Sequence, residues 1–346
     1  MDRYNAFRET PFMLPEEMVE QIADIRQYPL IDKILFLNEG QKLITQTTLS
    51  TTNHPFLIDH AIEGIPYHPG VMALEMFAEN ALLLKPEYRL AGFENVTFGL
   101  PVKIMKDKLT VRIESSMTVS DGDSIWVSCK LVSDLVNSKG EVFGEPRVHH
   151  QARVRLVASG EDLNQFLQSE VAQIPEIGTP GDGELIHPPD FIYSRYFHGP
   201  RFQSHGGILR GVGEGDSTGV DGIALMRHQL PDTEQFASEA IGEDVFLNAL
   251  PMLIEAGFQN AGLAAMEIDG YSSLPIGIEW STILRVPDTD ERLRMRSMRV
   301  SAEERGVTVH DVVIVGDDDA PILALKGLRL KAMSPVPEDE KFSLLR

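Results

Sequence analysis

The stretch from Val71 to Leu84 constrains the fold most, because its apolar residues point in nearly every direction around a helix axis. A helix of this kind must be buried on most of its sides, so the rest of the chain has to cover it. Glu75 and Glu79 lie four residues apart and therefore share one face of this helix. The two carboxylates mark either a polar seam or a solvent-exposed stripe, and we expect the stripe.

Strand patterns on both sides of this helix supply the cover. Two candidates precede it, Ile34–Leu37 and Lys42–Leu49. A longer series follows it, separated by turn sequences: Leu90–Phe98, Leu109–Val119, Ile125–Leu135 and Val148–Val157. A buried helix followed by several antiparallel strands predicts a hot-dog arrangement, in which a curved sheet wraps around a central helix.

A second apolar helix, Phe246–Met266, lies among strand patterns in the same order. Two strand candidates, Gly206–Val212 and Gly219–Met226, come before it. Four more follow it: Leu274–Trp280, Arg292–Val300, Val307–Val315 and Ile322–Met333. The sequence therefore predicts an α+β chain made of two such lobes, a double hot-dog.

The domain organisation follows from these two sets of elements. Helical spacing also predicts short helices over Pro15–Arg26 and Glu161–Gln173, outside the two lobes. We assign five segments: an entry segment (1–29), an N-terminal lobe (30–157), an inter-lobe linker (158–184), a C-terminal lobe (185–333) and a tail (334–346).

Composition and charge exclude several classes of function. Of the 346 residues, 42% are hydrophobic and 24% charged, as in ordinary soluble globular proteins, and no apolar run is long enough to cross a membrane. The net charge of −21 disfavours nucleic acid and anionic membranes as partners. The single cysteine, Cys129, excludes an intrachain disulfide and indicates a reducing, cytoplasmic location.

No metal or nucleotide site is predicted. The phosphate-loop pattern G-x-x-x-x-G-K-[ST], a cysteine cluster and the H-E-x-x-H pattern are all absent from the sequence. His149 and His150 are neighbours in a predicted strand, so their side chains point to opposite faces and are poorly placed to share a metal ion.

The first candidate site lies just before the Val71–Leu84 helix. His60 precedes a loop that contains Gly64 and Pro69, and the helix begins at Gly70 and Val71. A helix start presents free backbone N–H groups, which can hold a carbonyl oxygen as negative charge develops on it. The combination is suited to removing a proton next to a carbonyl, although a packed core histidine beside a loop would give the same pattern.

The second candidate site lies on the second helix. Glu255 and Gln259 are four residues apart on one face, and apolar residues flank Glu255. A carboxyl in such surroundings has a raised pKa and can stay protonated at neutral pH, with Gln259 fixing its orientation. The alternatives are a buried polar pair that stabilises the helix and an exposed stripe at a lobe interface.

The two sites together describe one reaction. A neutral His60 could take the proton from the carbon beside a thioester carbonyl, while a protonated Glu255 gives one to the departing β-hydroxyl. The N–H groups of Gly70 and Val71 could hold the enolate-like oxygen. The reaction is the loss of water from a 3-hydroxyacyl thioester, and it requires His60 and Glu255 to meet in space.

Four motifs resemble, in order, those of the dehydratase domains of polyketide synthases and related fatty-acid synthases. They extend over roughly Tyr28–Met333. Some phrases are also similar to those of iterative synthases that make polyunsaturated fatty acids. The motifs are H-x-x-x-G-x-x-x-x-P at His60, Gly64 and Pro69; Y-x-x-G-x-x-F at Tyr196, Gly199 and Phe202; the helix with Glu255 and Gln259; and Leu274-Pro-Ile with the later Leu325–Lys331.

The resemblance implies that (3R)-3-hydroxyacyl chains are converted to trans-2-enoyl chains, with His60 as base and Glu255 as acid. Glu255 replaces the aspartate that is usual in the family, so the site must accommodate a longer arm or place the acid differently. The substrate-binding positions implied by these motifs are Gly70, Val71, Gln259, Tyr196, Gly199 and Phe202. No cofactor or metal is expected to bind the domain itself.

The resemblance also implies a partner. The substrate would be carried on the phosphopantetheine arm of an acyl carrier protein, and related domains suggest a homodimer. Carrier proteins are commonly acidic, so a free carrier would be repelled by a chain of charge −21. Tethering in the same polypeptide removes that difficulty, because the effective concentration can reach roughly millimolar. We therefore expect a carrier in cis within a larger synthase.

Three other functions stay open on the sequence. Hot-dog lobes also form thioesterases, which release a free acid, and product-template cyclases, which direct aldol chemistry with a histidine and a carboxylate. A non-catalytic domain that binds an acyl chain or dimerises a synthase is the third. A structure tests the dehydratase interpretation by whether His60 and Glu255 face one tunnel, because side chains that open onto separate surfaces would leave it without a mechanism.

Overall fold

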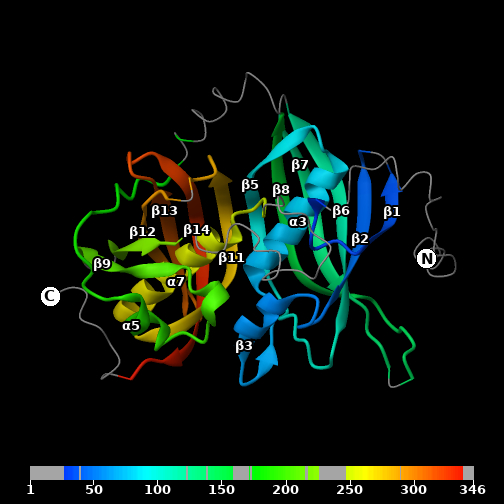
Figure 1. The fold of residues 1–346 in the computed structure, drawn as a ribbon, viewed down its shortest axis with the longest axis horizontal. Coiled ribbons are helices and arrows are strands. Elements are labelled where there is room, and N and C mark those ends of the chain that lie inside the picture. Colours follow the sequence, from blue (N-terminus) through cyan, green and yellow to red (C-terminus); the bar gives the residue numbers. More distant parts are fainter. Residues whose placement is uncertain are drawn as a thin grey trace.

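The computed structural model describes residues 27–38, 40–121, 124–137, 139–158, 171, 174–214, 217–225, 247–288 and 290–337. Its first lobe is built around α3 (Gly70–Leu84). Every residue of α3 after Gly70 is buried, as an all-apolar helix surface requires. The strands that wrap around it are β1 (Lys33–Asn38), β2 (Lys42–Leu49), β5 (Tyr88–Phe98), β6 (Leu109–Asp121), β7 (Ser124–Ser133) and β8 (Arg147–Ala158) (Figure 1).

The second lobe repeats this plan around α7 (Pro251–Asp269). The helix begins five residues after the predicted start, because Leu250 adopts a left-handed conformation (φ 49°) and Pro251 then fits the first turn. Gly270, also left-handed, ends it. Its strands are β9 (His205–Glu214), β10 (Ser217–Ala224), β11 (Tyr271–Ile283), β12 (Leu293–Glu303), β13 (Val307–Val315) and β14 (Pro321–Pro335).

The two lobes are joined by one continuous antiparallel sheet, in the order β1-β2-β6-β7-β8-β5-β11-β14-β13-β12-β10-β9. The junction is the pairing of β5 with β11, seen at the centre of Figure 1. Gly92 of β5 pairs with Thr282 of β11 at a positive φ of 149°, and a Cβ at Gly92 would collide with the backbone oxygen of Ser281. Glycine is therefore required at this junction.

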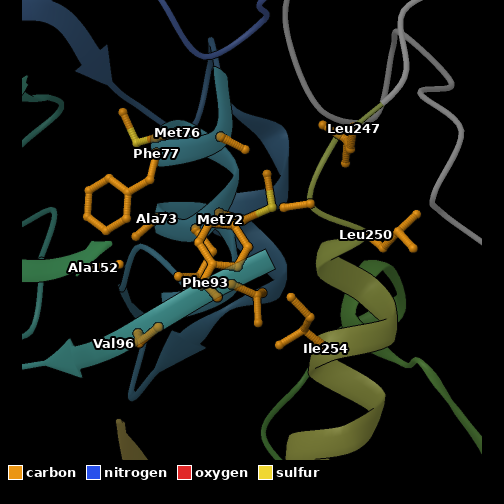
Figure 2. Close-up of a cluster of buried hydrophobic side chains, with 14 of the residues drawn as sticks. Met72, Ala73, Met76, Phe77, Phe93, Val96, Ala152, Leu247, Leu250 and Ile254 are labelled. Atoms are coloured by element: carbon orange, nitrogen blue, oxygen red, sulfur yellow. The ribbon is translucent and has the colours of Figure 1, made fainter. Parts of the chain in front are cut away.

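The hydrophobic core also crosses the junction. One cluster of buried side chains includes residues of both central helices and of the sheet between them. In Figure 2, Met72 of α3, Phe93 and Val96 of β5 and Ile254 of α7 lie close to one another. The lobes are thus one packed unit, and the predicted double hot-dog architecture is confirmed in outline.

Glu75 and Glu79 differ from the sequence expectation, because both carboxylates are fully buried. Glu75 accepts hydrogen bonds from the backbone N–H groups of Asn248 (2.7 Å) and Ala249 (2.6 Å), just before α7. Glu79 accepts one from the N–H of Leu30 (3.0 Å). Burial raises the pKa of each carboxyl. Helical spacing alone cannot separate such an acid from a solvated one, because its partners lie far away in the chain.

Short elements complete the region between the lobes. The first lobe contributes η2 (Pro55–Asp59) and the hairpin of β3 (Ala61–Ile62) and β4 (Ile65–Pro66). The second contributes α5 (Pro189–Tyr193) and η3 (Pro200–Phe202). Among the described residues, no helix combines the length and hydropathy needed to cross a membrane.

Two predicted helices cannot be compared with the structure. Pro15–Arg26 lies outside the described residues, and so does Glu161–Gln173 apart from Val171. The boundaries assigned to the entry segment (1–29), the linker (158–184) and the tail (334–346) remain predictions.

Replacing Glu75 with alanine should destabilise the fold. The change leaves two buried backbone N–H groups and the Asn248 side-chain amide without their acceptor. Each unsatisfied buried donor costs about 1–3 kcal/mol, so we expect the free energy of unfolding to fall by about 2–4 kcal/mol. Urea denaturation measures this, with the exposed Glu87→Ala as control, expected within about 0.5 kcal/mol of wild type. Equal effects of both changes would contradict the assigned role of Glu75.

His150 of β8 should make the fold sensitive to acid. Burial lowers the pKa of its ring to about 4, and nearby His149 adds to the shift. The unfolded chain takes up this proton near pH 6.5, so the stability contributed by the neutral ring is complete above pH 6.5 and is lost as the pH falls toward 4.

The variant His150→Leu should remove that dependence. Between about pH 7.5 and pH 5, the free energy of unfolding should fall by about 2 kcal/mol less in the variant than in wild type. Urea denaturation across this pH range measures the difference, and parallel curves for the two proteins would refute it.

Candidate active site

His60 lies at the end of η2, where the chain turns into the β3–β4 hairpin. The hairpin turn is made by Glu63 and Gly64, both at positive φ, and it brings Tyr67 back alongside His60. The Tyr67 N–H donates to the His60 carbonyl (2.9 Å), and His60 Nδ1 lies 2.9 Å from the Tyr67 carbonyl oxygen. A carbonyl can only accept, so Nδ1 carries the hydrogen and Nε2 keeps its lone pair for a reacting proton.

Side chains of the second lobe enclose this ring. The ring centroid of His60 lies 5.0 Å from that of Phe197, 5.5 Å from that of His198 and 5.4 Å from that of Phe202. Burial, with a smaller contribution from His198, lowers the pKa of His60 to about 4, although Glu255 opposes the shift. His60 is therefore neutral at physiological pH, as a base must be.

Contacts of Asp59 hold the segment around residue 199 against the first lobe. The Gly199 N–H donates to the Asp59 carbonyl (2.8 Å), and Arg201 Nη1 forms an ion pair with the Asp59 carboxylate (2.7 Å). A Cβ at Gly199 would collide with that carboxylate. This close approach explains why the motif needs glycine at this position.

Glu255 projects from α7 toward the same place, and only 6% of the residue is exposed. Its Oε1 lies 3.2 Å from His198 Nε2 and accepts a hydrogen bond from Gln259 Nε2 (3.0 Å). Gln259 is held in turn by the Phe202 carbonyl and by the Tyr193 hydroxyl. His60, His198 and Glu255, from both lobes, thus form one cluster, in which the side chains of His198 and Glu255 are buried and that of His60 is half-buried.

The pKa of Glu255 corrects the sequence expectation. Burial raises the pKa of this carboxyl, as its apolar flanks indicate, but hydrogen bonds from His198 and Gln259 and the electrostatic interactions with His198 and His60 together lower it by more. The pKa of Glu255 therefore lies below its usual range rather than above it. The two histidines that turn the pKa shift of Glu255 downward are distant in the sequence. His198 lies 57 positions earlier in the chain, and His60 lies on the opposite lobe.

The start of α3 also lies near this cluster. The N–H groups of Met72 and Ala73 both reach the Pro69 carbonyl, and those of Gly70 and Val71 have no acceptor among the described residues. A Cβ at Gly70 would lie 2.9 Å from the Phe98 ring. That ring packs against Phe258 of α7, with the two ring centroids 5.9 Å apart. Tyr67, which is hydrogen-bonded to the base His60, precedes this helix start by three residues. The contact of the Gly70 and Val71 N–H groups with a thioester oxygen remains a prediction.

The motif residues Tyr196, Gly199 and Phe202 all border the cluster. The Tyr196 hydroxyl donates to the Gln259 carbonyl (2.8 Å), and the Phe202 carbonyl accepts from the Gln259 side chain (2.7 Å). These contacts position the acid and the base, whereas direct contact of the three residues, or of Gln259, with substrate remains a prediction.

His198 is the site residue that the sequence analysis did not single out. Its signal was its place inside the motif, between Tyr196 and Gly199. Among the described residues, no group of three or more His, Cys, Asp or Glu side chains is placed to hold a metal ion.

The state of the His60 ring can be measured directly. We expect it to stay neutral, with hydrogen on Nδ1, down to about pH 5, because burial holds its pKa near 4. Nitrogen NMR of histidine-labelled protein reports both the tautomer and the titration, with His60→Gln to assign the signal. A midpoint near 6.5, the value of an unperturbed histidine, would contradict the enclosed site.

Comparison with curated proteins finds relatives that are mostly far longer. Polyketide synthase GfsA of Streptomyces halstedii is 24% identical over 319 residues, covering 89% of this chain and 4% of the synthase. A polyunsaturated fatty acid synthase of Thraustochytrium is 25% identical over 256 residues, covering 69% of this chain and 8% of the matched synthase polypeptide. The chain spans only a small part of the length of these synthases, and the matches leave the kind of synthase unresolved.

A shorter relative matches about a third of this chain. The 3-hydroxyacyl-[acyl-carrier-protein] dehydratase FabZ of Chlamydia pneumoniae is 28% identical over 130 residues, which is 35% of this chain and 84% of that protein.

Solved structures match the fold over most of the chain. The dehydratase domain from the CurF module of the curacin polyketide synthase superposes with a TM-score of 0.59 at 17% identity, covering 88% of this chain and 99% of that one. A trans-AT polyketide synthase dehydratase domain from Brevibacillus brevis gives 0.60 at 18% identity, covering 89% and 99%. At these identities the likeness shows the fold alone, and it confirms the double hot-dog.

Two family models match the chain, one in each lobe. Residues 28–133, which include His60, match the model of the polyketide synthase dehydratase domain. Residues 191–340, which include Glu255, match the model of the polyketide synthase dehydratase N-terminal domain. The matches together extend over most of both lobes, and the chain therefore belongs to the polyketide synthase dehydratase family, whose domains are hydro-lyases.

Proposed function

We propose that this domain removes water from (3R)-3-hydroxyacyl thioesters carried on the phosphopantetheine arm of an acyl carrier protein, giving trans-2-enoyl thioesters. The observation that carries the proposal is one buried site shared by the lobes. In it, a neutral His60 with a free Nε2 lies beside His198, and His198 Nε2 lies 3.2 Å from the Glu255 carboxyl.

The geometry assigns each step to a group. His60 Nε2 takes the proton from the carbon beside the thioester carbonyl, because Nδ1 is committed to the Tyr67 carbonyl. The carboxyl of Glu255 gives a proton to the 3-hydroxyl, which leaves as water. General acid and base groups contribute roughly a hundred- to ten-thousand-fold each to the rate. The N–H groups of Gly70 and Val71 hold the carbonyl oxygen while it carries negative charge.

The partner and setting are part of the same proposal. The net charge of −21 would repel a free acidic carrier, and the large synthases that the chain resembles contain many times its length. A carrier tethered in cis, and a homodimeric assembly, fit both facts. A reducing, cytoplasmic location fits the buried free thiol of Cys129.

Thioester hydrolysis is a second candidate, and one observation favours it. The lowered pKa of Glu255 favours a carboxylate, which could act as a general base toward water. The same group would then release a free acid instead of an enoyl thioester, so the products separate the two functions.

Mass spectrometry of a 3-hydroxyacyl thioester on a carrier protein or a pantetheine mimic tests the proposal. Wild type should remove one water, or add one to the enoyl thioester when that is supplied, because the equilibrium can favour the hydrated form. His60→Ala and Glu255→Gln should each lower the rate by about 100-fold or more, since each removes a general acid or base.

The controls are matched by residue type. His187→Gln and Glu87→Gln change a histidine and a glutamate outside the cluster, and we expect the wild-type rate from both. Free acid as the product would establish hydrolysis. No reaction with any chain length would establish a non-catalytic domain.

A further inference from the structure

His198 occupies the centre of the candidate site. Its ring lies between the base and the acid, with the His60 centroid 5.5 Å away and Glu255 Oε1 3.2 Å from Nε2. The side chains of His198 and Glu255 are only 7% and 8% exposed. At this burial, solvent cannot readily supply or remove the proton between them.

The neighbours of His198 fix its orientation. Phe197 stacks on the imidazole, with centroids 4.3 Å apart and ring planes 22° from parallel. The other nitrogen, Nδ1, is buried and has no hydrogen-bond partner among the described residues. Nε2 is therefore the nitrogen that this site uses, and the atom it faces is a carboxyl oxygen.

The Glu255 carboxyl is placed to accept hydrogen bonds. Oε1 already accepts an N–H from Gln259, a group that can only donate, so a second donor at Nε2 completes a carboxylate-like environment.

We propose that His198 shares with Glu255 the single proton that the site gives to the leaving hydroxyl, and so acts as a positioning residue for the acid. The inference rests on the proposed dehydration. With one proton, the pair is a neutral imidazole beside a carboxylic acid, or an imidazolium beside a carboxylate. The two arrangements have the same total charge. Burial penalises the two charges of the second, and their mutual attraction across the 3.2 Å contact offsets that cost.

The reaction balances with this one proton. The C–H bond at carbon 2 breaks and an N–H bond forms at His60 Nε2, while the electron pair becomes the new double bond. The C–O bond at carbon 3 breaks, and the oxygen takes the pair's proton and leaves as water. The pair is then one proton short and His60 holds one extra, and transfer of that proton back to the pair restores the site.

The other ionisable groups near His198 come from η2, α7 and the segment that contains His198 itself. His60 faces it from the end of η2 and Glu255 from α7, while the Tyr196 hydroxyl donates to the Gln259 carbonyl. The Asp59 carboxylate beside His60 is neutralised by Arg201. The pH response of the acid therefore depends on His198, His60 and Glu255.

The pH profile of His198→Gln tests the proposal. A glutamine amide can still donate a hydrogen bond to Glu255, but it cannot take up a proton. The proton must then reside on Glu255 alone, with two amide donors favouring its carboxylate. We expect kcat/KM for dehydration to be about 100-fold lower than wild type at pH 8 but within about 10-fold at pH 5.5.

A structural role for His198 would give a different result. It would lower kcat/KM by the same factor at every pH, and that outcome, or a wild-type profile, would overturn the proposal. Phe197→Leu is the control, because it removes the stacking partner and keeps the imidazole. We expect this control to retain the shape of the wild-type profile.

Nitrogen NMR of His198 at a single pH tests the sharing without turnover, because the chemical shift of Nε2 reports whether that atom carries a hydrogen. In Glu255→Gln the carboxyl that faces Nε2 becomes an amide, so we expect the Nε2 shift to change from that of wild type while the shifts of His187, outside the cluster, stay the same. An unchanged Nε2 shift would overturn the proposal even if His198→Gln failed to fold. Wild type that neither adds nor removes water would instead refute the proposed function, which keeps the two failures distinguishable.

Discussion

The pairing of β5 with β11 is the interaction on which the site depends. Neither lobe contains a complete set of reacting groups, since His60 belongs to the first and His198 and Glu255 to the second. The shared sheet and the core across it fix the two half-sites at separations of a few ångströms. Gly92 allows the strands to approach at the junction, and Gly199 allows the second lobe to reach Asp59 beside the base. Two glycines far apart in the chain therefore serve the same end.

Burial then sets the chemistry of the groups so assembled. It removes water from His60 and lowers its pKa to about 4, which makes the ring a neutral base. The same burial acting alone would raise the pKa of Glu255, but the Nε2 of His198 and the amide of Gln259 favour the carboxylate. One physical effect thus acts on both groups, and the hydrogen-bond partners decide how each responds.

The sequence could predict what depends on periodicity and local motif. The all-apolar surface of α3 predicts a central helix, and the repeated order of elements predicts the second lobe. His60 and Glu255 were found because their motifs are local. The contacts of Glu75 with Asn248 and Ala249 could not be found, because helical spacing shows which face a residue shares but not what lies opposite. The lowered pKa of Glu255 could not be predicted for the same reason, because only the tertiary structure brings His198 next to Glu255.

The glutamate at position 255 has a longer side chain than the family's usual aspartate, and its contacts account for that difference. The family resemblance implies aspartate where this chain has glutamate, and the extra methylene carries the carboxyl further from α7. In this structure the carboxyl at the end of that longer arm meets His198 Nε2, while Gln259, one turn along the same helix, holds it from the side. A longer arm has more rotamers to restrict, and two donors on Oε1 restrict them. The glutamate and the histidine are therefore best understood together, as one arrangement of an acid whose proton and orientation are both supplied by its partners.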